Sequence, residues 1–286
     1  MQNPPSHADN TAPAMAAGLT VVAISSLGDI DPNEWDALVP DAHPFLLHAF
    51  LLALEESRSV GADTGWEPLY LTARTQEGAL VAALPNYVKY NSYGEYVFDH
   101  AWANGFERAG GHYYPKFLTA IPFTPVPGPR LLSREQNPQL AGAMGAALTE
   151  LAQNNDISSA HINFLSDADR AVLDAQGWMI RKGVQFHWHN HGYQQFDDFL
   201  AALSSRKRKN IRKERKSLAD DGVRFLQLTG DDITQQHWDK FYEFYLATID
   251  KKWGGAYLTR GFFDRIGQHL ADKILLIMAE QDGDII

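Results

Sequence analysis

An internal repeat is the feature that most constrains what this chain can fold into. The segment Gly28-Asp-Ile-Asp-Pro-Asn-Glu-Trp35 has a counterpart in Gly230-Asp-Asp-Ile-Thr-Gln-Gln-His-Trp238, and helical sequence, a strand-like run and a turn glycine follow each. The turn glycine lies 50 residues after the first glycine in one copy (Gly78) and 53 in the other (Gly283). Such self-similarity predicts a duplicated strand, helix, helix and hairpin. Because the second copy reaches only the hairpin at Ile286, we expect it to be truncated and the chain to be a fragment.

Apolar periodicity and turn residues predict the elements within the repeats. Residues 68–74 and 79–89 are strand-like runs joined through Thr75 to Gly78, which indicates an antiparallel hairpin. The stretch 90–132 is rich in aromatic residues and glycine and has little clean periodicity. The other expected strands are 19–26, 158–165, 178–188, 222–228 and 274–279, and the expected helices are 44–56, 136–154, 167–176, 203–218 and 258–272. The expected domains are a disordered tail (1–18), a first domain (19–192), a basic linker helix (193–221) and the beginning of a second domain (222–286).

A cluster of basic residues lies between the two repeats. Eight of the eleven residues from Arg206 to Lys216 are Lys or Arg, in a chain whose net charge is -10. Apolar residues recur at helical spacing from Leu200 to Leu218, which predicts one long helix with cations around most of its surface. A solvated helix face is the ordinary explanation of such a run. Its concentration in an otherwise acidic chain favours anion binding.

Composition narrows the chemistry. The chain has 286 residues, of which 45% are hydrophobic, enough for globular domains. The absence of cysteine excludes disulfides, thiolate zinc sites and thioester-forming nucleophiles. No apolar run reaches the roughly 18 residues of a membrane span, and no basic residue precedes Arg58, which argues against a signal peptide. We therefore expect a cytoplasmic protein with no membrane span, and its acidic balance argues against DNA as a partner.

Three histidines raise the question of a metal site. His187, His189 and His191 alternate at the end of the expected strand 178–188, which would place all three on one face. Three ligands within five residues of one strand converge poorly on a single ion. We therefore expect no metal site there, and we interpret His161, alone in an apolar strand, as a core residue.

The predicted order of strands and helices is the order found in the GNAT acyltransferase fold. Two such units, with mixed central sheets flanked by helices and joined through a basic helix, resemble the Fem-type aminoacyltransferases. The basic run Ser204-Ser-Arg-Lys-Arg-Lys-Asn-Ile-Arg-Lys213 carries part of this resemblance. The segments 93–99, 113–116 and 122–130 are more specific and are similar to the FemAB-like branch named for peptidoglycan biosynthesis or recognition. The resemblance extends over about residues 19–286.

The resemblance implies an enzyme that transfers an acyl or aminoacyl group to an amine, with a cell-wall peptide precursor as the possible acceptor. The implied donor substrates are acyl-coenzyme A or aminoacyl-tRNA, with no tightly bound cofactor and no acyl-enzyme. Catalysis then consists of positioning, oxyanion stabilisation and removal of a proton from the amine. Two alternatives stay open. One is a non-catalytic protein that binds a cell-wall precursor or a nucleotide conjugate, and the other is RNA binding through the basic helix.

The candidate site residues lie in the aromatic stretch and in the basic helix. Asp99 is the candidate proton acceptor, and Lys116 is the candidate ligand of an anion or oxyanion. The candidate substrate and anion ligands are Arg206, Arg208, Asn210, Arg212, Trp102, Tyr113, Tyr114, Thr124 and Arg130. The arginines suit phosphate because a guanidinium donates two parallel hydrogen bonds. The structural alternatives are pairing of the cations with carboxylates, packing of the aromatic rings and a rigid proline-rich turn at 122–130.

Overall fold

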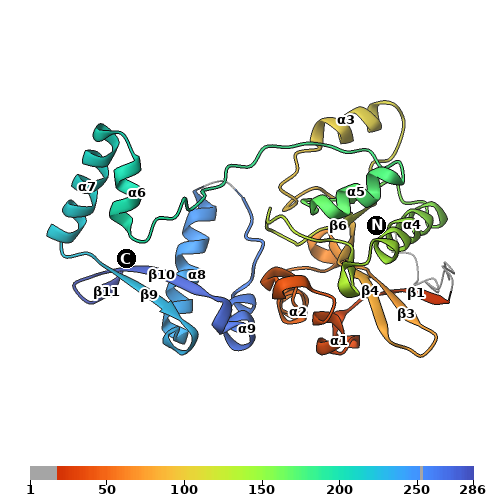
Figure 1. Cartoon of the computed structure of the whole chain (residues 1–286), viewed down its shortest axis with the longest axis horizontal. Coiled ribbons are helices and arrows are strands. Elements are labelled where there is room, and N and C mark those ends of the chain that lie inside the picture. The colour runs from red at the N-terminus through yellow and green to blue at the C-terminus, as the bar shows by residue number, and fades with distance from the viewer. Residues whose placement is uncertain (1–17, 252–253) are drawn as a thin grey trace. The chain divides into compact units, whose positions relative to one another are not determined.

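The computed structural model describes residues 18–251 and 254–286 (Figure 1). It is a mixed α/β structure with three small sheets flanked by helices. The chain divides into two compact units, and the first unit runs to Ile180 and also contains Tyr242–Leu270. The second unit comprises Arg181–Phe241 and Ala271–Ile286. The predicted tail, apart from its last residue, lies outside the described residues, as do residues 252 and 253.

The first sheet is antiparallel and has the order β1-β3-β4-β7. Its strands are β1 (Leu19–Ile24), β3 (Tyr70–Thr75), β4 (Leu80–Leu84) and β7 (Leu132–Ser133). The hairpin predicted from the sequence is confirmed as β3 and β4, and Gly78 has a φ of +90° in its turn. Residues with a side chain are strained at this φ, which explains the glycine.

The second sheet has the order β2-β5-β6-β8, and its β6–β8 pair is parallel. Its strands are β2 (Trp66–Pro68), β5 (Asn86–Lys89), β6 (Lys116–Thr119) and β8 (Ala160–Ile162). The run 79–89, predicted as one strand, is divided at Pro85 into β4 and β5, which belong to different sheets. Proline has no N–H to donate to a strand ladder, so it is a natural place for the chain to leave one sheet for another.

Helix α4 (Pro138–Asn154) builds the core of the first unit. The Asn137 side chain accepts hydrogen bonds from two backbone N–H groups of its first turn. Met144 and Leu148 are buried with apolar residues of β1, β3 and β4. Figure 1 shows α5 (Asp167–Ala175) beside α4, and the two helices are in contact. The other α-helices of this unit are α1 (Pro32–Asp36), α2 (His48–Glu56), α3 (His100–Arg108) and α9 (Arg260–His269).

The second unit contains an antiparallel sheet of order β11-β10-β9 and a pair of helices. Its strands are β9 (Arg224–Thr229), β10 (Leu275–Gln281) and β11 (Asp284–Ile285), and its helices are α6 (Phe196–Ala202) and α7 (Ser205–Asp220). Helix α8 (Gln235–Asp250) follows β9 in the chain. The basic helix predicted over 203–218 is confirmed as α7. Its apolar seam from Leu200 is interrupted, because Leu203 and Ser204 have ψ angles of 157° and 150° and separate α6 from α7.

Two predictions of secondary structure were wrong. Residues 178–188 form no strand, and Met179 and Phe186 are 88% and 98% exposed. A β-branched and aromatic run needs a partner strand for its backbone hydrogen bonds, and the described residues provide none there. The three histidines therefore share no strand face, and no group of three or more His, Asp or Glu side chains within 18–251 and 254–286 is placed to hold a metal ion. The second error was α3, which the sequence analysis treated as part of an irregular stretch.

A search of the described residues for membrane-spanning helices found none that is long and apolar enough.

The packing of α4 yields a stability prediction. Leu148→Ala should lower the free energy of unfolding by about 2–5 kcal/mol, because the side chain is fully buried and its removal leaves a cavity. Urea denaturation followed by circular dichroism measures the change. Glu150→Ala, exposed on the same helix, is the matched control and should change the value by less than about 0.5 kcal/mol. Equal losses in both variants would contradict this assignment of the core.

Candidate functional site

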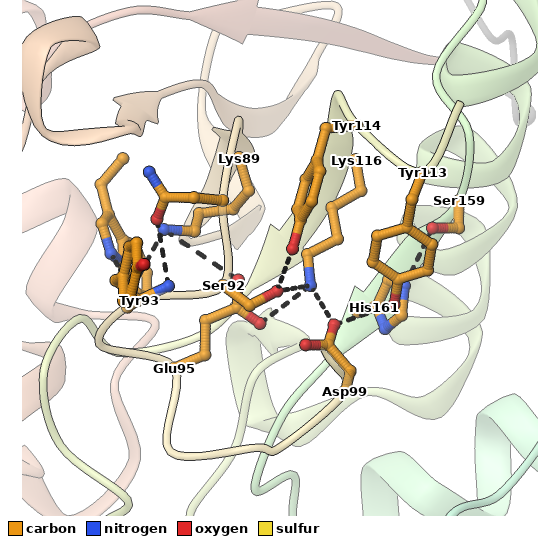
Figure 2. Close-up of polar contacts among 12 residues, drawn as sticks. Lys89, Ser92, Tyr93, Glu95, Asp99, Tyr113, Tyr114, Lys116, Ser159 and His161 are labelled. Atoms are coloured by element: carbon orange, nitrogen blue, oxygen red, sulfur yellow. Dashed lines mark hydrogen bonds and ion pairs between the residues drawn. The ribbon is translucent and has the colours of Figure 1, made fainter. Parts of the chain in front are cut away.

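A cluster of buried charges lies against the second sheet of the first unit (Figure 2). At its centre is Lys116, the first residue of β6, whose side chain is fully buried. Its ammonium nitrogen donates hydrogen bonds to Glu95 Oε2 at 2.9 Å, Asp99 Oδ2 at 2.6 Å and Ser92 Oγ at 3.0 Å. An ammonium has three N–H donors, so Lys116 uses all of them within the protein.

A second lysine lies beside the first. Lys89 on β5 is directly opposite Lys116 in the antiparallel β5–β6 pair, which brings two like charges together. The Lys89 ammonium lies 3.8 Å from the centre of the Trp66 ring and 4.0 Å from Glu95 Oε1, and it donates to the Tyr93 backbone oxygen at 3.4 Å. The two carboxylates therefore balance two lysines, and we call these four residues the buried charge cluster.

The chain between β5 and β6 closes the buried charge cluster. Asp99 is the residue that precedes α3, and the Tyr113 hydroxyl donates to its Oδ2 at 2.8 Å. The hydroxyls of Ser92 and Tyr114 are 2.7 Å apart. Gly94 has a φ of +76°, and a Cβ there would lie 2.6 Å from the Phe123 ring. Only glycine allows the backbone to pass this close to the ring and bring Glu95 back over the sheet.

Burial and pairing shift the pKa values of these groups in different directions. Burial raises the pKa of Asp99, but hydrogen bonds from Lys116 and Ser92 outweigh it and hold the pKa at about 2. Burial raises the pKa of Glu95 above its ordinary value, although the charge of Lys116 opposes the shift. Burial also lowers the pKa of Lys89 to about 7, against the attraction of Glu95. Asp99 is thus an anion at any pH well above 2. Burial instead favours the uncharged forms of Glu95 and Lys89.

Two carboxylate oxygens of the cluster have no hydrogen-bond partner among the described residues. They are Glu95 Oε1 and Asp99 Oδ1, and both atoms are buried. Buried carboxylate oxygens are normally satisfied, because an unsatisfied one keeps its full desolvation cost. The arrangement therefore offers two acceptors to a donor such as an amine or a water molecule.

The structure brings some of the predicted site residues together. Asp99, Lys116, Tyr113 and Tyr114 lie in one network, as Figure 2 shows. Trp102 lies on α3 and is half-exposed.

The predicted ligands in the proline-rich segment lie outside that network. Arg130 is fully buried, and its guanidinium donates to the backbone oxygens of Val126 at 2.6 Å and Pro129 at 3.0 Å. Its backbone N–H donates to Asp169 Oδ2 at 2.6 Å. Arg130 thus braces its own segment, in which Thr124 is half-buried.

The predicted residues of the basic helix belong to the second unit. Arg206 and Asn210 on α7 are exposed, and Arg208 is half-buried. Arg212 Nη2 lies 3.2 Å from Asp197 Oδ1 of α6. Pairing with carboxylates, the structural alternative considered for this helix, is present at Arg212.

Comparison with known families decides what kind of protein this geometry belongs to. Residues 26–286 match the FemAB-like family, described as peptidoglycan biosynthesis/recognition. The chain belongs to the FemAB-like family. The resemblance predicted from the sequence is therefore confirmed. A search of curated proteins found no significant match.

Sequence reasoning missed half of the site of this FemAB-like protein. Lys89 was treated as the end of a strand, and Ser92 and Glu95 were not selected. A signal was present at Lys89, because a lysine that ends a mostly apolar run must be buried with a counter-charge or turn outward. Glu95 and Asp99 are separated by four residues, but the chain between them is not helical, so no periodic pattern indicated that both reach one lysine.

The central position of Lys116 can be tested by removing its charge. In this FemAB-like protein, Lys116→Met should lower the free energy of unfolding by about 3–5 kcal/mol, because Glu95 and Asp99 stay buried without a cation. Adding Glu95→Gln and Asp99→Asn should restore part of the loss. Lys216→Met is the control, since Lys216 forms an exposed pair with Asp220 and should cost less than about 1 kcal/mol. Equal effects at the two lysines would contradict the assignment.

The low pKa of Asp99 predicts a pH dependence. Its pKa is about 2 in the folded protein and ordinarily 3.8. The stability that this shift contributes is fully present above the ordinary value and is lost as the pH falls through about 2. Asp99→Asn should therefore flatten the fall in stability over this acid range. Urea denaturation of both proteins at a series of pH values measures it, and parallel curves would refute the pairing.

Proposed function

We propose that this FemAB-like protein transfers an acyl or aminoacyl group to an amine of a peptidoglycan-precursor peptide, and that the buried charge cluster holds that amine. Membership of the family supports the reaction class. One observation supports the site, namely two buried carboxylate oxygens, on Glu95 and Asp99, that accept no hydrogen bond from the described residues. A protonated amine is a donor of the right charge for two such acceptors.

The carboxylates have different roles in this proposal. The amine nitrogen donates to Asp99 Oδ1 and Glu95 Oε1, and one of its protons passes to Glu95. Glu95 suits the transfer because burial raises its pKa, whereas Asp99, with a pKa of about 2, is a weak base. The nitrogen lone pair then forms the new C–N bond. The donor's ester C–O or thioester C–S bond breaks, and its leaving group carries away the electron pair and takes up a proton.

Lys116 acts as a positioning residue in this proposal. Its three donors are occupied by Ser92, Glu95 and Asp99, so it orients the carboxylates and has no N–H left for a substrate oxyanion. The chain from Tyr90 to Asp99 covers the cluster and must open to admit the amine. Two aromatic side chains of this segment, Tyr93 and Tyr96, are exposed on its outer surface.

We also propose that the chain contains two related GNAT-like repeats. In the first, β1 pairs antiparallel with β3, which forms a hairpin with β4. In the second, β9 pairs antiparallel with β10, which forms a hairpin with β11. In both, a 3₁₀ turn follows the first strand and two α-helices come before the second, in agreement with the repeat in the sequence.

A binding protein without transferase activity is the second candidate function. The observation that favours it is the complete use of the Lys116 donors inside the protein, together with the burial of Glu95 and Asp99. Such a protein recognises the amine of a cell-wall precursor and leaves it unchanged. Binding of the precursor without product formation, in the presence of either donor, distinguishes it from the transferase.

The role of Glu95 gives the decisive experiment. The protein is incubated with a nucleotide-linked cell-wall peptide and with either acetyl-coenzyme A or an aminoacyl-tRNA, and the acylated peptide is measured by mass spectrometry. Glu95→Gln should reduce the rate by about 10²–10⁴-fold, the usual contribution of a proton acceptor. Glu150→Gln, exposed on α4, should leave it unchanged.

The pH profile separates this chemical role from a structural one. Wild-type activity should fall as the pH decreases through the raised pKa of Glu95, because the protonated acid cannot accept the proton. The residual activity of Glu95→Gln should lack this limb, while its melting temperature confirms that it is folded. Full activity in a folded Glu95→Gln protein would sink the proposal.

A further inference from the structure

A groove in the second unit lies between the two helices that precede β9. Its volume is about 400 Å³, and its lining residues are Gln195, Phe196, Asp197, Leu200, Arg212 and Arg215. All of them belong to α6, to its first cap or to α7. The volume is within the range of about 300–1,000 Å³ that small-molecule sites in proteins occupy. The groove therefore has room for one compact ligand group.

Phe196 and Arg215 lie in contact in one wall of the groove. The guanidinium carbon of Arg215 lies 4.3 Å from the centre of the Phe196 ring, and this ring is 43% exposed. Aromatic rings and guanidinium planes are the surfaces on which nucleic-acid bases stack, because every base has a π face. The Phe196–Arg215 pair thus fits a planar heterocycle.

Helix α7, which forms one side of the groove, is strongly cationic. Arg208, Arg212 and Arg215 follow one another at spacings of four and three residues, so they lie on one side of α7. Arg208 and four more cations of this helix, namely Arg206, Lys207, Lys209 and Lys213, have no carboxylate within ion-pair distance in the described part of the chain. A helix with this excess of positive charge attracts phosphate, and its arginines can hold it through two hydrogen bonds.

We propose that this groove binds a phosphorylated nucleoside, with the base stacked on Phe196 and a phosphate held by Arg212 and Arg208. The inference deepens the proposed function and rests on it for the source of the ligand. Coenzyme A and the 3′ end of an aminoacyl-tRNA both carry an adenosine with phosphate, so the groove recognises the part that the two possible donors share.

Asp197 forms an ion pair with Arg212, one of the two arginines proposed to hold the phosphate. Its Oδ1 lies 3.2 Å from Arg212 Nη2, and both side chains are more than half exposed. An exposed pair of this kind is weak, so a phosphate can displace the carboxylate. Asp197 then competes with the ligand for Arg212. Removing its charge should strengthen binding, the opposite of what the loss of a structural contact does.

The experiment measures binding and needs no turnover. The protein is titrated with coenzyme A by calorimetry and with a fluorescein-labelled single-stranded RNA ending in CCA by fluorescence anisotropy. Phe196→Ala should weaken the binding of the recognised probe about 5-fold to 100-fold, the contribution of one stacked base. Arg212→Ala should weaken it and reduce its salt dependence, and Asp197→Asn should tighten it. Phe196→Leu keeps an apolar side chain but removes the ring, so it should also weaken binding. It distinguishes the loss of stacking from a loss of folding.

The controls separate this inference from the proposed function. Arg170→Gln removes a half-exposed arginine on α5 that forms an ion pair with Asp167, and binding should not change. Saturable binding with the expected variant effects, but without acyl transfer, supports the groove and overturns the transferase. Transfer that is indifferent to Phe196→Ala and Arg212→Ala overturns the groove and leaves the transferase. No binding of either probe to the folded protein also overturns the groove.

Discussion

The burial of the Lys116 ammonium is the constraint on which the site of the first unit depends. Moving an ammonium out of water costs several kcal/mol unless carboxylates and hydrogen-bond acceptors replace the solvent. Glu95, Asp99 and Ser92 supply them, and all three come from the chain that connects β5 to β6. The connection must follow a path that brings these three oxygens to the Lys116 ammonium. The close approach of Gly94 to Phe123 is part of that path.

The same burial gives the charges unequal chemistry. Lys89 and Lys116 are opposite each other on neighbouring strands, yet Lys89 lies over an indole ring and Lys116 lies among three oxygen atoms. The carboxylates differ in the same way. The hydrogen bonds to Asp99 outweigh its burial and lower its pKa, whereas burial of Glu95 outweighs the charge of Lys116 and raises its pKa. A set of two lysines and two acids therefore contains one constant anion, Asp99, and two groups, Glu95 and Lys89, whose pKa values burial shifts toward the uncharged form. Such shifted pKa values are typical of sites that transfer protons.

Local sequence signals were reliable wherever one element satisfied its own backbone. Helix α4 and the β3–β4 hairpin were predicted correctly, since a cap, an apolar stripe and a turn glycine act within the element itself. The prediction of a strand at 178–188 was wrong because a strand needs a partner strand, and the sequence pattern does not show whether one is present. Helix α3 was missed because it has only nine residues, contains a glycine (Gly105) and lies within an aromatic stretch that has no clean periodicity.

The sequence by itself determined the α/β class, the basic helix, the family and the presence of Asp99, Lys116 and their tyrosines in one irregular stretch. Only the tertiary structure decided that Glu95 and Lys89 lie beside these residues. It also decided that the Arg130 guanidinium donates to the backbone of its own proline-rich segment. Composition and periodicity record which side chains are polar. They do not show which residues an irregular segment brings into contact. The pKa of a buried group depends on those contacts. For this protein those neighbours come from different strands and from the connection between them.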